Sequence, residues 1–381
     1  MYLKKSWLFL TILYSISVSA EIEVNAESKL SRDDNIYKVG DQIKVSDTYF
    51  QLAPQINFLG RTGKQEYILQ YSGDYAKFNS FDEADYYDHK IDSFINLEHT
   101  SKLKYNLAAG FERAHEDPGS LNRVQLEIRE YNKYERKYFS ATAKYGQNDA
   151  IGQFIFGYRI VSRKFVNNDL DYLDYSADIM TGKFSYRLAT RIRAYVDTLW
   201  GEYDYDPAQN YELDNTYRKF GIGLSWDFTN KLSGDVNIGY QERNYVQENL
   251  TDIKGLAYDG EINWKINTFT TLTAIAKRES IDSSIENTGG FLRSSYTISF
   301  EHALTPLINF EGGVFFSEDE LAVTSGREDE RNMYFVSISK YLSTKLVVKA
   351  EYNFEKREST YELANYKSNL FVVGVEYRLG M

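Results

Sequence analysis

Charged side chains of both signs alternate with small or apolar residues along many segments of the sequence. Side chains at every second position share one face of a β-strand, so these charges would lie on a common polar surface. Such a surface, mixed with Asn, Gln, Ser and Tyr, suits the wall of a water-filled pore for hydroxyl-rich solutes such as sugars. Because both signs are interleaved, the sequence predicts no strong selectivity for anions or cations. The residues that we predict to line the pore are Arg159, Arg163, Arg193, Asp197, Asp235, Arg243, Glu261, Glu311, Lys349, Glu351 and Arg357.

The same charges have a simpler interpretation, in which they pair across neighbouring strands and merely hydrate and stiffen the wall. For any single residue this is the more common arrangement. The acidic loop tips, such as Asp33-Asp34, could bind Ca²⁺ or bridge to lipopolysaccharide through divalent ions, although such tips are more often simply solvated.

Catalytic chemistry has no signature in the sequence. The four histidines, His89, His99, His115 and His302, stand in no metal-ligand spacing, and neither a nucleophile elbow nor a phosphate-binding loop occurs. The absence of cysteine excludes disulfides, thiolate metal sites and a cysteine nucleophile. We therefore predict that the protein is not an enzyme and has no catalytic residue, cofactor or bound metal.

The elements that position these side chains are long strands. In residues 220–228 and 371–379, large apolar side chains occupy every second position, and most of the residues between them are small or polar. A period of two indicates a strand with two different faces and excludes a helix. Runs of this kind last about 10–14 residues, which is longer than the usual soluble strand and sufficient for a tilted membrane strand.

Short turns, for example at Arg61-Thr62-Gly63 and Ser343-Thr344, alternate with longer acidic segments such as residues 81–85 and 317–320. A repeat of this length fits either a propeller with short strands or a membrane barrel with long ones, and the strand length favours the barrel. We predict an all-β fold, a single antiparallel up-and-down transmembrane β-barrel of about 18 strands over residues 21–381. The charge-rich residues 114–132 could form a long loop or a strand extension.

The composition excludes several other classes of protein. The chain has 381 residues, of which 33 are Tyr and 23 Phe, and its formal net charge is −11. It lacks the long apolar runs of a helical membrane protein and is too aromatic for a disordered one. An acidic chain without clustered Lys and Arg predicts no nucleic-acid partner. In a barrel, the Tyr and Trp residues would form girdles at the level of the lipid headgroups.

Residues 1–20 are typical of a secretory signal peptide. Lys4 and Lys5 precede an apolar stretch, and small residues end with Ala20, after which we predict cleavage. The alternative is an uncleaved anchor. An exported barrel predicts the outer membrane of a Gram-negative cell, with outer-membrane lipid, lipopolysaccharide and the barrel-assembly machinery as partners.

Several segments resemble the second putative β-barrel porin family. They are residues 223–234, 239–245, 271–280, 301–305 and 352–359, and residues 33–37 with Pro54 extend the likeness over most of the chain. Because members of this family are often encoded with polysaccharide export systems, the resemblance implies an outer-membrane conduit for an exopolysaccharide or capsular polysaccharide. It further implies polysaccharide and periplasmic polysaccharide-export proteins as partners. The leading alternative is a general diffusion porin for small sugars or ions, and a third is a non-conducting adhesin or hydrolase.

Overall fold

The computed structural model describes residues 19–120, 130–206, 212–229, 231–282, 289–322 and 327–380. These residues form one antiparallel sheet of eighteen strands. The strands are β1 (Ser19–Asp33), β2 (Asp47–Thr62), β3 (Gln65–Phe78), β4 (Tyr86–Glu98), β5 (Leu103–His115), β6 (Lys133–Tyr145), β7 (Gly152–Phe165), β8 (Tyr175–Ala189), β9 (Ile192–Tyr205), β10 (Asn215–Thr229), β11 (Leu232–Tyr245), β12 (Ile253–Lys265), β13 (Thr270–Asp282), β14 (Gly290–Thr305), β15 (Ile308–Leu321), β16 (Glu328–Tyr341), β17 (Leu346–Ser359) and β18 (Tyr366–Gly380).

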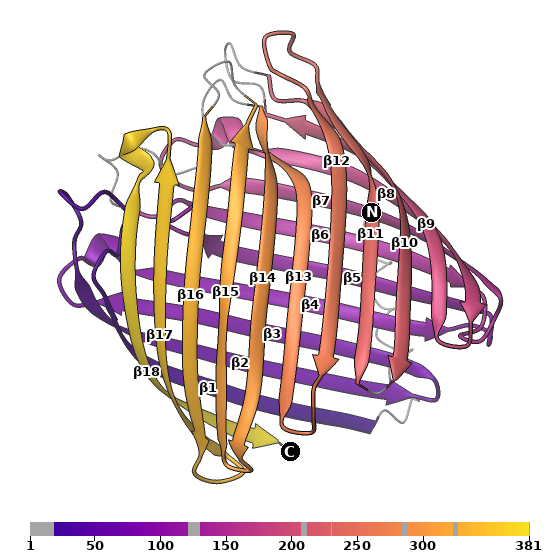
Figure 1. Ribbon diagram of the computed structural model, residues 1–381, viewed down its shortest axis with the longest axis horizontal. Helices are drawn as coiled ribbons and strands as arrows, with labels where there is room; N and C mark the ends of the chain where they lie inside the picture. Colours follow the sequence, from indigo (N-terminus) through magenta and orange to yellow (C-terminus); the bar gives the residue numbers. More distant parts are fainter. Residues whose placement is uncertain are drawn as a thin grey trace, which may run out of the picture.

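The strands pair in chain order, and β1 pairs with β18 as well as with β2, so the sheet closes and has no edge. Figure 1 shows β1–β9 and β10–β18 as the two opposite walls of this barrel. Closure satisfies the backbone hydrogen bonds that lipid cannot supply. The prediction of a single all-β barrel of about 18 strands is confirmed. Within the described ranges, no helix is long and apolar enough to cross a membrane.

Alternation of residue types determines the two faces of each strand. In β18, Phe371 and Val373 are 55% and 58% exposed, whereas Val372 between them is 7% exposed. Directly paired residues share a face, so the pairing of Phe371 with Tyr352 carries the apolar outer face to β17 and onward around the ring. The predicted girdle residues all lie on this outward phase: Tyr67, Tyr71, Tyr186, Trp226, Trp264, Tyr352 and Tyr377.

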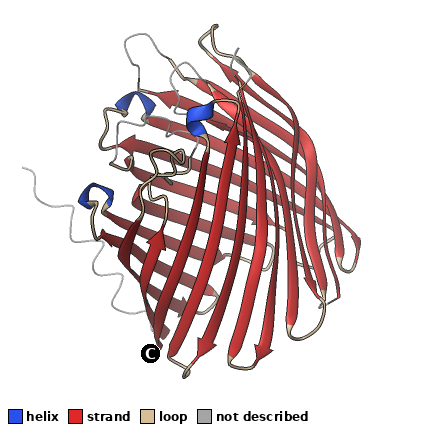
Figure 2. Cartoon of the chain, turned by 60° about the vertical axis from the view of Figure 1, so that its left-hand side comes forward, coloured by secondary structure: helices blue, strands red, loops and turns tan. Residues whose placement is uncertain are grey.

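The two ends of the barrel differ in the length of their connections. At one end tight turns join the strands, for example residues 63–64 between β2 and β3. At the other end lie longer loops, three of which contain the short helices η2 (Asp82–Ala84), η3 (Asp171–Leu173) and η4 (Glu362–Ala364) (Figure 2). In outer-membrane barrels the short turns face the periplasm and the long loops the exterior.

Two segments with boundaries predicted from the sequence are residues 114–132 and the signal peptide, residues 1–20. Residues 116–132 connect β5 to β6 as a loop, of which residues 121–129 lie outside the described part. Strand β1 begins at Ser19, which pairs with Arg61, and the preceding residues of the predicted signal peptide lie outside the described part as well.

Gly239 in β11 is a point of close backbone approach. A β-carbon at this position would collide with the carbonyl oxygen of Phe220 and would lie 2.7 Å from the Cα of Gly221. Because backbone atoms cannot rotate away, we expect Gly239→Ala to destabilise the barrel by about 1–3 kcal/mol, the usual cost of overpacking. Thermal unfolding followed by heat-dependent gel mobility would measure this loss.

The matched control is Gly182→Ala in β8, whose new carbon would make only an ordinary 3.4 Å contact with Thr198. Equal losses of stability in the two variants would show that the loss of glycine itself, and not the collision at Gly239, is the cause.

Candidate functional site

The register places every predicted pore residue on the inward phase, opposite the exposed apolar side chains. Arg159 shares a face with Ser140 and Ile179 on its neighbouring strands, and Glu311 shares one with Ser337. The remaining predicted residues follow the same rule: Arg163, Arg193, Asp197, Asp235, Arg243, Glu261, Lys349, Glu351 and Arg357.

Several of these side chains are held within the wall. Arg243 is 3% exposed and donates to Ser280 at 2.9 Å and to Asn215 at 2.8 Å. Arg193 donates to two carbonyl groups within the turn of residues 148–150. These residues therefore stiffen the wall, as the simpler interpretation of the charges predicts.

The inner wall carries both signs of charge on most strands, but three neighbouring strands differ. The inward positions of β6, β7 and β8 carry basic side chains and no carboxylate. Strand β16 lies opposite β7 in a ring of eighteen. On the two strands that precede β16, Glu301 of β14 and Glu311 of β15 are exposed without an ion pair among the described residues. The predicted interleaving of signs holds along strands such as β9, β11 and β17 but not along β6–β8. The inward basic residues of β6–β8 are Arg136, Lys144, Arg159, Arg163, Lys183 and Arg187.

Arg159 lies over the face of an aromatic ring. Its guanidinium carbon is 4.7 Å from the centre of the Tyr138 ring. Tyr138 reaches across Gly110, its direct partner on β5, and donates a 2.8 Å hydrogen bond to Asp92 on β4. A side chain at Gly110 would occupy the place of the ring. The glycine thus allows the ring to lie along the wall, with the cation against it.

Lys183 repeats this arrangement on the next part of the wall. Its Nζ atom is 3.3 Å from the centre of the Tyr195 ring. Tyr195 reaches across Gly223 on β10 and donates a 2.5 Å hydrogen bond to Asp235 on β11. Asp197, which is directly opposite Lys183, accepts a hydrogen bond from an Asn side chain and forms no ion pair with Lys183 among the described residues. Neither Lys183 nor Arg159 therefore forms an ion pair within the described ranges.

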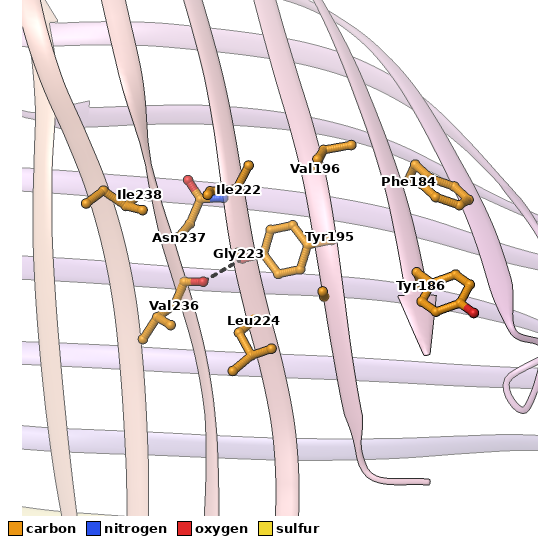
Figure 3. Close-up of a pocket in the computed structure, with 11 residues that line it drawn as sticks. Phe184, Tyr186, Tyr195, Val196, Ile222, Gly223, Leu224, Val236, Asn237 and Ile238 are labelled. Carbon is orange, nitrogen blue, oxygen red and sulfur yellow. Dashed lines mark hydrogen bonds between the residues drawn. The ribbon is translucent and has the colours of Figure 1, made fainter. Parts of the chain in front are cut away.

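A groove of about 540 Å³ lies on the outer wall behind Tyr195. Figure 3 shows the ring of Tyr195 lying toward Gly223, with apolar side chains of neighbouring strands around the groove. Its lining includes Phe184, Val196 and Ile238 on the outward phase. Because this lining is apolar and faces lipid, the groove is not part of a path for polar solutes.

The loop that follows β5 crosses the interior of the barrel. The Asp117 carboxylate is 2.9 Å from a guanidinium nitrogen of Arg331 on β16. Arg357 on β17 donates to the carbonyl oxygens of Gly119 and Ser120, the latter at 3.2 Å. Since Arg331 and Arg357 both lie on the inward phase, the loop must fold inside the ring of strands. It narrows the lumen at the long-loop end.

The loop of residues 34–46 packs beside this crossing loop. The hydroxyl group of Tyr131 donates a 2.9 Å hydrogen bond to the carbonyl oxygen of Ile36. Lys38 is 3.1 Å from Asp33 and 3.9 Å from Glu355, which also pairs with Arg331. Both loops are therefore bound to one charge network on the inner wall.

The contact between Asp117 and Arg331 anchors the crossing loop, and the charge of Arg331 determines how this anchor responds to pH. Crowding by neighbouring groups would raise the pKa of Asp117, whose side chain is still 51% exposed, but the charge of Arg331 and the backbone N–H of Gly119 outweigh it and hold that pKa below its usual 3.8. A carboxyl group with a lowered pKa stabilises the anchor above its usual pKa and loses this effect as the pH falls through the lowered value. We expect bilayer conductance to be the same at about pH 7 and about pH 5 and to rise only in stronger acid. A rise already between those two values would contradict the assignment.

The closed sheet, the outward apolar band and the polar interior define an outer-membrane β-barrel of the porin class. The family model described as "Putative beta-barrel porin 2" matches residues 21–379, and the chain belongs to that family. Its family and its fold are those of channels. A search of the curated proteins found no match to the sequence.

Three solved structures show the same fold at low sequence identity. OccK2 (OpdF) of Pseudomonas aeruginosa is 9% identical with a TM-score of 0.52, over 95% of this chain and 98% of that one. OpdK of the same species, solved with vanillate, is 10% identical with a TM-score of 0.52, over 95% and 99%. A BenF-like porin from Pseudomonas fluorescens is 7% identical with a TM-score of 0.53, over 95% and 99%.

The prediction of a conduit for exopolysaccharide or capsular polysaccharide is wrong. The chain's own family is a porin family, one of the structures that share the fold is a BenF-like porin, and two others have been solved with the small molecules glucuronate and vanillate. The crossing loop also narrows the path that a sugar chain would need. Polysaccharide and its periplasmic export proteins are therefore no longer expected as partners, and the findings support the alternative of a diffusion porin.

Proposed function

We propose that the protein is an outer-membrane diffusion porin for small solutes and that it favours solutes carrying a carboxylate. The observation that carries this preference is the pair Arg159 and Lys183, which face the lumen without a carboxylate partner among the described residues. An anionic solute would supply the missing negative charge. In support, OccK2 and OpdK, which share the fold, have been solved with glucuronate and vanillate, and both of these molecules carry a carboxylate.

The basic inward face of β6–β8 gives the proposal a mechanism. The basic wall of β6–β8 attracts the carboxylate, while exposed acids such as Glu311 on the opposite side repel it. Uncharged hydroxyl groups can bond to Ser, Thr and Asn side chains along the same inward phase. A small acid would therefore be oriented across the lumen at the level of Arg159 and Lys183.

Solute uptake by liposomes containing the purified protein tests both parts of the proposal. Glucuronate, glucose and glucosamine have similar sizes and differ in charge. We expect glucuronate to enter fastest and glucosamine slowest. Equal rates for all three solutes would contradict the preference for carboxylates but not the function of a diffusion porin. No uptake of any of them would contradict the function of a diffusion porin.

We further propose that the predicted pore residues line the solute path wherever their side chains are not held within the wall by other residues. Residues 1–20 would be removed as a signal peptide. The barrel-assembly machinery and outer-membrane lipid would be the partners during insertion.

A further inference from the structure

The outer wall carries a cluster of cations at the long-loop ends of β5, β6 and β7. Arg113, Lys137 and Lys164 lie on the outward phase, and Glu135 is the direct cross-strand partner of both Arg113 and Lys164. Directly opposed side chains have β-carbons about 4.5–5.5 Å apart, so these residues form one patch. We call Arg113, Lys137 and Lys164 the cationic patch.

One carboxylate cannot neutralise the cationic patch. The nearest guanidinium nitrogen of Arg113 is 3.8 Å from Glu135, and the two side chains are 54% and 31% exposed. The Nζ atom of Lys137 is 5.8 Å from the centre of the Phe111 ring. Neither Lys137 nor Lys164 forms an ion pair in the part of the chain that the structure describes. The patch therefore keeps positive charge available for a ligand.

Outward-facing cations on β10, β12 and β13 at this end of the barrel have close carboxylate partners, whereas Arg32 of β1 and Lys367 of β18 form no ion pair among the described residues. The fold therefore does not require unpaired cations at this level of the wall. The paired cations of β10, β12 and β13 are Arg218 with Glu242 at 3.6 Å, Lys254 with Asp252 at 3.2 Å, and Arg278 with Glu320 at 2.9 Å.

The cationic patch lies at the edge of the apolar band. Phe139, the next outward residue after Lys137, is 46% exposed, and Ile160 on β7 is 43% exposed. With a rise of about 3.3 Å per residue, Lys137 is roughly 7 Å beyond Phe139 along the strand. The cations are thus at headgroup level on the long-loop side, which is the outer leaflet of an outer membrane.

We propose that the cationic patch binds the phosphate of a phosphorylated glycolipid of the outer leaflet, with the acyl chains of that lipid against Phe139 and Ile160. Phosphate accepts charge-assisted hydrogen bonds from both Arg and Lys. The apolar surface directly beside the cations favours a lipid over a free anion. This proposal concerns the outer wall and does not depend on which solute crosses the lumen.

Lipid retention by the purified full-length barrel tests the proposal. Wild type, the variant Arg113→Gln/Lys137→Gln/Lys164→Gln and the control Arg218→Gln/Lys254→Gln/Arg278→Gln would be mixed with bisphosphorylated lipid A in detergent, and bound lipid counted by native mass spectrometry. The control removes the same charge from outward positions at the same end, where each cation is already paired. Heat-dependent gel mobility confirms that each barrel is folded.

We expect the patch variant to bind lipid A roughly tenfold more weakly than wild type, since each exposed charge contact contributes modestly, and the control to bind as wild type does. Dephosphorylated lipid A should bind all three proteins weakly. Equal binding by the wild type and the patch variant would overturn the proposal. So would equal retention of phosphatidylglycerol and lipid A by wild type, or full displacement of lipid A by millimolar inorganic phosphate, since either shows a site for any anion.

Discussion

Replacing Arg331 and Arg357 together by methionine is expected to raise the single-channel conductance severalfold. Both side chains reach inward and hold the loop that follows β5, Arg331 through Asp117 at 2.9 Å and Arg357 through the Ser120 carbonyl at 3.2 Å. Methionine keeps much of the apolar volume of arginine but has no N–H donor. Without these donors the loop loses its polar anchors on β16 and β17 and no longer narrows the lumen.

The barrel itself is expected to fold, because the remaining carboxylates keep partners. Asp329 retains Arg327, which donates to it at 2.8 and 2.6 Å, and Glu355 retains Lys38 and the hydroxyl group of Tyr366. Leaving either acid without a partner would cost about 3–5 kcal/mol. The double substitution should therefore release the loop at a smaller cost in stability than the burial of Arg357 alone suggests.

Planar-bilayer recordings would compare the single-channel conductance of wild type, the double variant and a control variant. Arg378→Met is the matched control, since Arg378 also faces inward but pairs with Glu376 at 2.6 Å near the short-turn end, away from the crossing loop. Its conductance should equal that of wild type. An unchanged conductance in the double variant, or the same rise in the control, would mean that the loop does not limit flow.

The fold could be predicted from the sequence because its main determinant is local. Alternation within residues 371–379 or 220–228 fixes which side chains face lipid, and each strand shows it independently of its partners. The same phase also predicts which side chains face inward, and in the register Arg159 and Glu311 lie on the side opposite the exposed apolar residues.

The candidate site depends on partners that are distant in sequence, so alternation could not reveal it. Tyr138 meets Asp92 across 46 positions, and Asp117 meets Arg331 across 214. Lys183 was missed for the same reason, although a glycine within a strand, such as Gly223, is a signal of close approach that could have directed attention to Tyr195. The run of three neighbouring strands without an inward carboxylate also appears only when the strand pairing is known. The wrong prediction of polysaccharide export had a different origin. It rested on the resemblance to a family whose members are often encoded with polysaccharide export systems, and not on the chemistry of any residue.

Replacing Arg159 and Lys183 by glutamine is expected to shift the channel from anion towards cation preference. A unit charge at about 4 Å in water is worth about 1 kcal/mol to a passing ion, or about fivefold in its relative permeability. Two such changes should produce a clear shift of the reversal potential under a salt gradient. The shift should shrink at high salt, because ions screen the wall charges. Glu301→Gln/Glu311→Gln should shift the potential in the opposite direction.

Substituting the supporting rings separates the charge of these cations from their position. Tyr138→Leu/Tyr195→Leu removes both rings, and with them the hydrogen bonds to Asp92 and Asp235, but leaves the charge of the wall unchanged. If the rings hold Arg159 and Lys183 where a carboxylate passes, glucuronate uptake should fall while the reversal potential in simple salt stays near wild type. A parallel change in both measurements would show that the rings act only through the overall field. An unchanged uptake would show that the cations need no positioning.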